Sequence, residues 1–136
     1  MRFTRRHAFA TLAAAAAFTV ASVGPASAGS NSSHSYGIAR GGCAHVSDGW
    51  FTHDGEIFHL DDTCADGFAA VIKVDIEPFQ SGGGYDYALW SHLSADGGVE
   101  TWNKSYAEGT GVCLQAGFGH EGGEWAGWGT WRCGTA

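Results

Sequence analysis

The four cysteines are the residues whose spacing most restricts the chemistry of this 136-residue chain. They are Cys43, Cys64, Cys113 and Cys133. No two of them have the C-x₂₋₄-C spacing that lets two thiolates reach one zinc ion. An even number of cysteines in an exported chain instead predicts disulfides. Three pairings are possible, and Cys43–Cys64 with Cys113–Cys133 is favoured because each closes a loop of roughly twenty residues, which contributes about 3 kcal/mol.

The densest acidic cluster raises the possibility of a calcium site. Its members are Glu56, Asp61, Asp62 and Asp66. If Gly67 takes the glycine position of an EF-hand, Cys64 and Lys73 fall at the third and twelfth positions, where oxygen ligands belong. An EF-hand is therefore excluded. The pattern favours a solvated turn beside a disulfide, and a shallower calcium site stays open.

The histidines and serines do not form a recognisable catalytic or metal motif. No His-Glu-x-x-His occurs, and the turn signal at residues 54–55 separates His53 from His59. No Gly-x-Ser-x-Gly occurs either, and Ser91 and His92 would point to opposite faces of one strand. We predict surface or turn histidines, no metal site, no catalytic residues and no cofactor.

The tryptophans are the residues that could form a binding face. Sugars stack on exposed indole rings, but a small β domain also builds its core from aromatic side chains. Strand alternation over residues 125–131 places Trp125 and Trp131 on one face and Trp128 on the other. The candidate ligand-binding residues are Trp128, Trp102 and Trp90.

The elements that must position these residues are predicted to be strands. In residues 70–77, Ile72, Val74 and Ile76 alternate with mostly charged residues, and Pro78 then ends the hydrogen-bond ladder. Asp-Gly steps mark tight turns, and helical periodicity is hard to find after residue 28. We predict an all-β domain, a single small antiparallel sandwich or barrel with two disulfides. The other strands are expected at residues 56–60, 85–93, 99–102, 112–116 and 125–133.

The N-terminus has the pattern of a secretory signal peptide. A basic start with Arg2, Arg5 and Arg6 precedes an alanine-rich apolar run over residues 10–23, and Ala-Ser-Ala at 26–28 matches a cleavage site. The run is shorter and less apolar than the roughly 20 residues of a membrane span. The predicted organisation is a signal peptide at 1–28, a flexible leader at 29–42 and a disulfide-bonded β domain at 43–136.

Cleavage after residue 28 would make the protein strongly acidic. It removes three of the seven basic residues and none of the fourteen acidic ones, so four against fourteen leave a net charge of −10. Nucleic acid and anionic lipid both require a basic footprint. The charge therefore argues against nucleic acid as a partner and against membrane attachment after cleavage.

The spacing of the cysteines carries a family resemblance. Gly42-Cys43 opens the domain, Cys64 leads into the strand at 70–77, Cys113-Leu114-Gln115 follows late, and Trp131 to Gly134 closes it as Trp-x-Cys-Gly. In these features the chain resembles small secreted four-cysteine actinobacterial proteins of the spore-associated protein A type. The resemblance implies a location at the cell or spore exterior and supplies no catalytic residues.

From these observations we expect a secreted, non-catalytic structural or interaction protein of the bacterial cell or spore exterior, acting as a monomer on an extracellular glycan or protein. The first alternative is a small carbohydrate-binding (lectin-like) or protease-inhibitor-like module. The second alternative is a small extracellular hydrolase.

Overall fold

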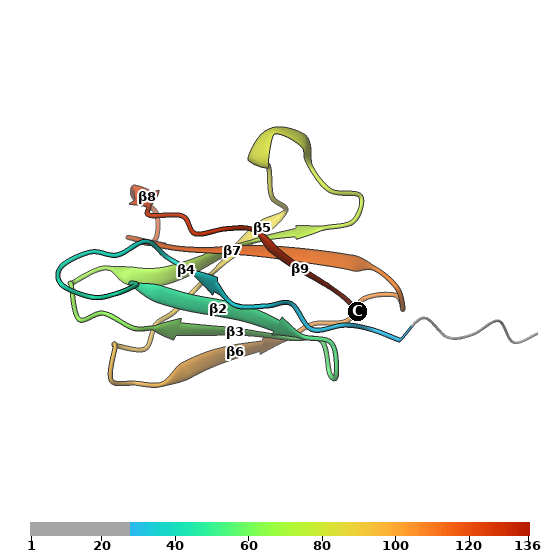
Figure 1. The fold of residues 1–136 in the computed structure, drawn as a ribbon, viewed down its shortest axis with the longest axis horizontal. Helices are drawn as coiled ribbons and strands as arrows, with labels where there is room; N and C mark the ends of the chain where they lie inside the picture. The colour runs from blue at the N-terminus through green and yellow to red at the C-terminus, as the bar shows by residue number, and fades with distance from the viewer. Residues whose placement is uncertain (1–27) are drawn as a thin grey trace, which may run out of the picture.

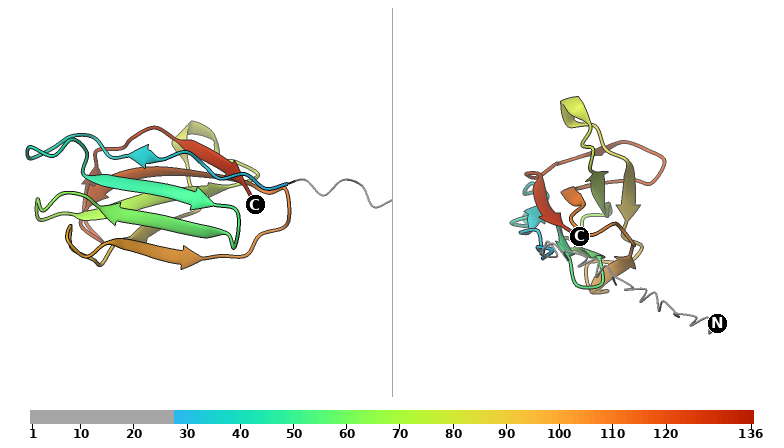
Figure 2. Two further views of the ribbon diagram at one scale, coloured as in Figure 1. Left: turned by 60° about the horizontal axis from the view of Figure 1, so that its bottom comes forward. Right: turned by 90° about the vertical axis from the view of Figure 1, so that its right-hand side faces the viewer.

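The computed structural model describes residues 28–136, which form two antiparallel sheets packed face to face (Figures 1 and 2). The all-β prediction is confirmed, and the architecture is a sandwich without closure into a barrel. The predicted signal peptide falls on residues 1–27 and the adjoining Ala28, so it lies almost entirely outside the described residues. Within residues 28–136, no helix is long and apolar enough to cross a membrane.

One sheet has four strands and the other has five. The four-stranded sheet contains, in spatial order, β1 (Ser35–Tyr36), β2 (Ser47–Thr52), β3 (Ile57–Asp62) and β6 (Val99–Asn103). The five-stranded sheet contains β5 (Tyr87–Trp90), β4 (Ala69–Ile76), β7 (Gly111–Gly119) and β8 (Trp125–Ala126), with β9 (Arg132–Thr135) also paired to β7. A short 3₁₀ turn, η1 (Ser81–Gly83), lies in the connection between β4 and β5. Figure 1 shows this connection projecting from the five-stranded sheet, away from the other sheet.

The core lies between the two sheets, as strand alternation predicts. Phe51, Phe58 and Leu60 project from the four-stranded sheet, while Ile72 and Leu114 project from the other, and all five are fully buried. Strand β4 is also covered on its outer side, where Val71 is fully buried and the Asp75 residue is only 5% exposed. The amphipathic pattern identified the inner face correctly but did not reveal that the outer face is covered as well.

Strand β5 is shorter than predicted, and this changes the position of Tyr85. Alternation over residues 85–93 predicts that Tyr85, Tyr87, Leu89 and Leu93 share one face. Of this group, Tyr87 and Leu89 do pack against the core. The Asp86 carboxylate accepts hydrogen bonds from the backbone N–H of Ile76 and the side-chain amide of Gln80, so the chain is still turning at this point. Alternation therefore begins only at Tyr87, and Tyr85 lies on the opposite side of the sheet, outside its predicted group.

Residues 29–42 belong to the folded domain, so the predicted start of the domain near Cys43 is wrong. Ser30 forms a β-bridge with Thr135, with N–O distances of 2.8 and 2.9 Å. Ser35 is fully buried; its hydroxyl donates to the carbonyl of Thr130 at 2.8 Å and accepts from the N–H of Ala116 at 3.0 Å. Small polar residues hold this segment by hydrogen bonds rather than by apolar burial, which explains why composition alone suggested a flexible leader.

Both favoured disulfides are present. Cys43–Cys64 joins the segments that flank the β2–β3 pair, and Cys64 is buried against Val46. Cys113 and Cys133 face each other across β7 and β9. No free cysteine occurs in the described part of the chain.

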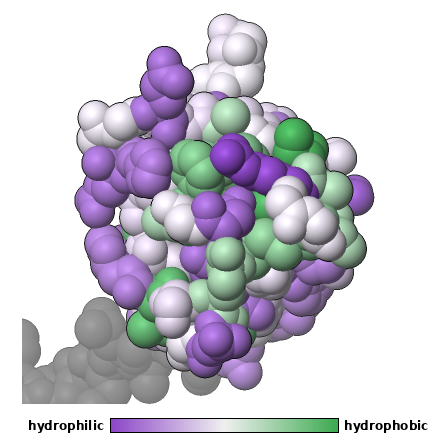
Figure 3. All heavy atoms as spheres, turned by 90° about the vertical axis from the view of Figure 1, so that its left-hand side faces the viewer, coloured by the Kyte–Doolittle hydropathy of each residue, from purple (hydrophilic) through white to green (hydrophobic). Residues whose placement is uncertain are grey.

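The connections at one end of the sandwich carry a mixed surface. This is the end at which residues 37–46, 63–68, 91–98 and 120–124 join the strands. Figure 3 shows hydrophilic residues interspersed there with smaller apolar patches. The larger aromatic clusters lie instead on the outer faces of the two sheets.

Candidate binding surface

The outer face of the five-stranded sheet carries aromatic rings arranged around one lysine. The Nζ atom of Lys73 lies 3.9 Å from the ring centroid of Trp128, 5.3 Å from that of Tyr85 and 5.6 Å from that of Trp125. Trp90 stacks on Trp125 with centroids 5.4 Å apart and an interplanar angle of 27°. We call these five residues the lysine cage. All of them are half-buried.

Strand pairing and two glycines make room for the lysine cage. Val71 of β4 faces Gly117 of β7, and the Trp128 ring lies over this glycine. A Cβ atom at Gly117 would be 2.6 Å from Cε3 of Trp128, and one at Gly119 would be 2.7 Å from Cβ of Trp125. Such distances are far below an ordinary contact, so the indoles can lie on the sheet only because β7 has no side chains there.

Trp125 and Trp128 lie on the same face, so the prediction that they point in opposite directions is wrong. Their ring centroids are 5.4 Å apart at an interplanar angle of 67°. Gly127 has a φ of 69°, which is in the left-handed region, and β8 ends one residue before it. The predicted strand over residues 125–133 is therefore interrupted and resumes only at Arg132.

The structure brings together two of the three candidate tryptophans. Trp90 and Trp128 both belong to the lysine cage, in which Trp125 joins them. Trp102 pairs with Phe58 in the other sheet and packs against the core between the sheets. It therefore does not contribute to the surface on which Trp90 and Trp128 lie.

The ammonium group of Lys73 contacts aromatic rings rather than a carboxylate. Burial lowers the pKa of the Lys73 ammonium, because a charged group loses hydration there. The negative ring faces attract the cation and offset part of that loss, by about 1–2 kcal/mol for a partly desolvated site. Because Lys73 already lies over the Trp128 ring, this indole is a poorer platform for a sugar than the sequence alone suggested.

A groove adjoins the lysine cage along β4. Asp75 is two residues from Lys73 on the outer side of the strand, and its carboxylate accepts the backbone N–H of Gln80 at 3.1 and 3.2 Å. The cavity above it has a volume of about 330 Å³. We call it the Asp75 groove. Its lining residues are Asp75, Phe79, Gln80, Gly83, Gly84, Cys113 and Trp131.

Sequence reasoning missed the groove because no local pattern marks it. Asp75 occupies an outward position of an amphipathic strand, which normally predicts a solvated carboxylate. Its burial depends on the β4–β5 connection, which directly follows it in the chain, and on Trp131, which comes from a distant part. Asp75 also pairs directly with Cys113, a disulfide cysteine, and this register is visible only in the structure.

The outer face of the four-stranded sheet carries a row of stacked rings. Trp50 lies between His34 and His59, with centroid distances of 4.6 and 4.7 Å and interplanar angles of 22° and 2°. The ring faces therefore cover one another. Burial and the neighbouring His34 lower the pKa of His59, while burial raises the pKa of Asp48 against the opposing effect of its 2.7 Å contact with His34. The sequence placed these histidines at the surface but did not indicate the stack.

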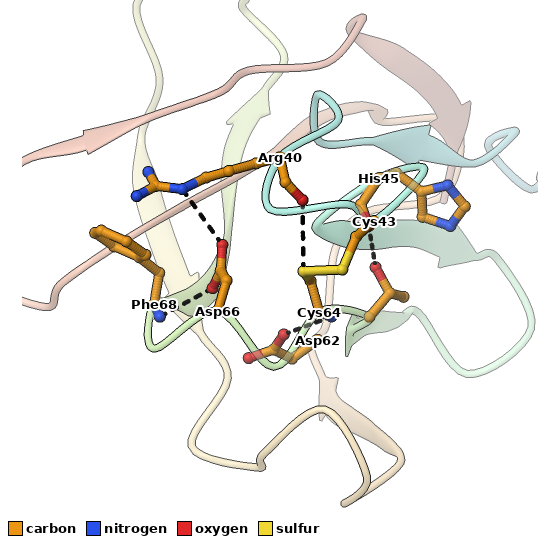
Figure 4. Close-up of a disulfide and its surroundings, with 8 residues drawn as sticks. Arg40, Cys43, His45, Asp62, Cys64, Asp66 and Phe68 are labelled. Atoms are coloured by element: carbon orange, nitrogen blue, oxygen red, sulfur yellow. Dashed lines mark hydrogen bonds and ion pairs between the residues drawn. A yellow bond between two sulfur atoms is a disulfide. The ribbon is translucent and has the colours of Figure 1, made fainter.

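Two residues of the acidic cluster, Asp62 and Asp66, hold a turn beside a disulfide (Figure 4). Asp62 accepts the backbone N–H of Cys64, and Asp66 accepts that of Phe68. Arg40 pairs with Asp66 at 3.6 Å and lies over the Phe68 ring. The turn beside the disulfide was predicted, but Asp62 is buried rather than solvated. In residues 28–136, no three His, Cys, Asp or Glu side chains gather as a metal site.

What this surface can do chemically follows from its charges and rings. The lysine cage surrounds the protein's own ammonium group with aromatic rings. The Asp75 groove presents a buried carboxylate beside two aromatic side chains. No protein-family model, curated protein or solved structure matches this chain.

Proposed function

We propose that this protein is a secreted, non-catalytic interaction domain of the bacterial cell exterior, which binds an extracellular glycan or protein through the outer face of its five-stranded sheet. The observation that carries the proposal is the Asp75 groove. Its volume of about 330 Å³ falls at the lower end of the range for ligand pockets. A carboxylate and an amide side chain line it together with Phe79 and Trp131. This combination of apolar walls with few polar groups is typical of binding sites.

Two kinds of observation support an extracellular location: the disulfides and the composition of the chain. Both disulfides are compatible with an oxidising compartment. The signal-like N-terminal pattern and the acidic balance of residues 29–136 point the same way. Mass determination of the protein recovered from the culture medium tests this part, because export predicts a chain that begins at Gly29. Recovery of the uncleaved chain from the cytoplasm would contradict it.

The lectin-like alternative is favoured by the composition of the groove. Phe79 and Trp131 could stack on a sugar ring while Asp75 and Gln80 hydrogen-bond its hydroxyl groups. This alternative differs from protein binding only in the ligand that occupies the same groove. Competition by soluble oligosaccharides therefore separates the two.

Binding to isolated cell envelopes of an actinobacterium tests the proposed surface. Phe79 and Tyr36 form a matched pair, because they are 49% and 47% exposed, and only Phe79 lines the groove, whereas Tyr36 belongs to β1 of the four-stranded sheet. We expect the wild type and Tyr36→Ala to sediment with the envelopes, and Phe79→Ala to remain largely in the supernatant. Failure of the wild type to sediment, or equal losses in the two variants, would count against this surface.

A further inference from the structure

We propose that the Asp75 groove binds an organic ammonium group, with Asp75 as the counter-ion and Phe79 and Trp131 as the walls. This inference rests on the proposed function and names the ligand chemistry of the same site. The groove is open to solvent, so a side chain or an amino sugar can enter it while the rest of the ligand remains outside.

The first argument is the uncompensated charge of Asp75. The residue is only 5% exposed, and a buried carboxylate is costly unless it is paired or well hydrogen-bonded. Among the described residues, both of its oxygens share a single N–H donor, that of Gln80. The ion pairs of the described residues join His34 to Asp48 and Arg40 to Asp66, and none of them involves Asp75. An ammonium with three donors would supply both the charge and the missing hydrogen bonds.

The second argument is that the lysine on this face is already engaged. Lys73 lies two residues before Asp75 on the same side of β4, yet its Nζ atom lies over the Trp128 ring at 3.9 Å. The lysine cage therefore holds the protein's own ammonium away from the groove. The same cage shows how rings on this face accommodate an ammonium, and Phe79 and Trp131 repeat that chemistry beside Asp75.

The third argument favours an ammonium over other cations. Calcium requires six to eight oxygen ligands, whereas in residues 28–136 no three acidic, histidine or cysteine side chains gather around a point. A guanidinium prefers two free carboxylate oxygens for its parallel hydrogen bonds. The N–H of Gln80 lies between the two Asp75 oxygens, at 3.2 and 3.1 Å, where a bidentate guanidinium would bind, whereas a compact ammonium can use the remaining lone pairs.

Nuclear magnetic resonance titration of the labelled protein tests the inference. Three ammonium probes represent the possible sources: Nα-acetyl-lysine methylamide for a protein side chain, 1,5-diaminopentane for a free amine and glucosamine for an amino sugar. Their neutral counterparts are Nα-acetyl-norleucine methylamide, 1,5-pentanediol and N-acetylglucosamine. We expect at least one ammonium probe to shift the Trp131 indole and Gln80 amide resonances, and to bind at least about tenfold more tightly than its neutral counterpart.

Two substitutions that each remove one negative charge provide the matched comparison. Asp75→Asn keeps the shape of the side chain, and we expect it to weaken ammonium binding by about tenfold or more. Asp96→Asn makes the same change at an exposed turn outside the groove, and we expect no effect. If Asp75→Asn does not fold, Phe79→Leu replaces it, because Phe79 is exposed and its ring is expected to contribute severalfold to cation affinity.

The outcomes separate this inference from the proposed function. Equal binding of neutral and ammonium probes, or unchanged binding by Asp75→Asn, would overturn the ammonium assignment but leave a binding groove in place. If no probe shifts the groove resonances while the protein still sediments with envelopes, the ammonium inference alone fails. If the wild-type protein does not bind the envelopes, the proposed function itself is overturned.

Discussion

Replacing Gly117 by alanine is the most direct test of how the lysine cage packs against β7. The new methyl group would lie 2.6 Å from Cε3 and 2.8 Å from Cζ3 of Trp128, and 2.8 Å from the carbonyl oxygen of Ala126. Ordinary carbon contacts are about 3.5–4.0 Å, so the indole must move by roughly 1 Å or the strands must separate. The carbonyl belongs to the β8 backbone and has little freedom to shift.

Two opposing effects determine the size of this destabilisation. Alanine is favoured over glycine inside a strand by about 0.5–1 kcal/mol. Overpacking of a well-filled site typically costs about 1–3 kcal/mol. We therefore expect the free energy of unfolding to fall by about 1 kcal/mol, which for a domain of this size lowers Tm by about 4–8 °C.

Urea unfolding followed by circular dichroism measures the change, and the Trp128 indole resonance reports the displacement of the ring. Gly123→Ala is the matched control, because a Cβ there would be no closer than 3.3 Å to any neighbour and the residue is exposed. We expect the control to stay within about 0.5 kcal/mol of the wild type. A Gly117→Ala variant with wild-type stability and an unshifted Trp128 resonance would refute the packing described for the lysine cage.

Three further predictions concern the rest of the sandwich. The double substitution Cys113→Ala and Cys133→Ala removes a disulfide with a sequence separation of 20. We expect urea unfolding to show that the free energy of unfolding falls by about 3 kcal/mol, and an unchanged midpoint would contradict this. Burial lowers the pKa of His59 below its ordinary value of 6.5, so the unfolded chain binds this proton more readily than the folded one. The free energy of unfolding should therefore fall as the pH drops through 6.5 and below. His59→Gln should flatten that fall between pH 7 and 5. Burial raises the pKa of Tyr87, whose hydroxyl is hydrogen-bonded to that of Tyr106. The unfolded chain therefore loses this proton first, and stability should decline as the pH rises above 10. Ultraviolet absorbance that shows ionised Tyr87 in the folded protein near pH 10 would contradict this.

The strands were predictable because alternation is a local property of the chain. Residues 70–77 were predicted as a strand, and β4 spans Ala69–Ile76 with Ile72 and Val74 buried between the sheets. The glycine at 127 illustrates the limit of such patterns. Alternation was extended through it, whereas in the structure its positive φ ends β8 and turns Trp128 onto the same face as Trp125. Whether a glycine continues or ends a strand depends on what its neighbours pack against.

The candidate site was predictable only in part. Trp90 and Trp128 were chosen for their chemistry, and they do share one surface. Their meeting around Lys73 depends on strand pairing and on the empty space above Gly117, which are not encoded near either tryptophan. Trp102 was chosen for the same chemistry, yet it packs against the core, because its position in β6 points inward.

The amino-acid sequence by itself determined the all-β class and the favoured disulfide pairing, because strand alternation and loop length are read within short segments. Tertiary structure decided that Ser30 and Ser35 join the domain, because their hydrogen-bond partners, Thr135 and Thr130, lie at the other end of the chain. It also decided that Asp75 is buried, because a carboxylate loses water only when other segments cover it. Distant contacts of this kind leave no local pattern, and two residues of the proposed binding groove, Cys113 and Trp131, reach Asp75 in this way.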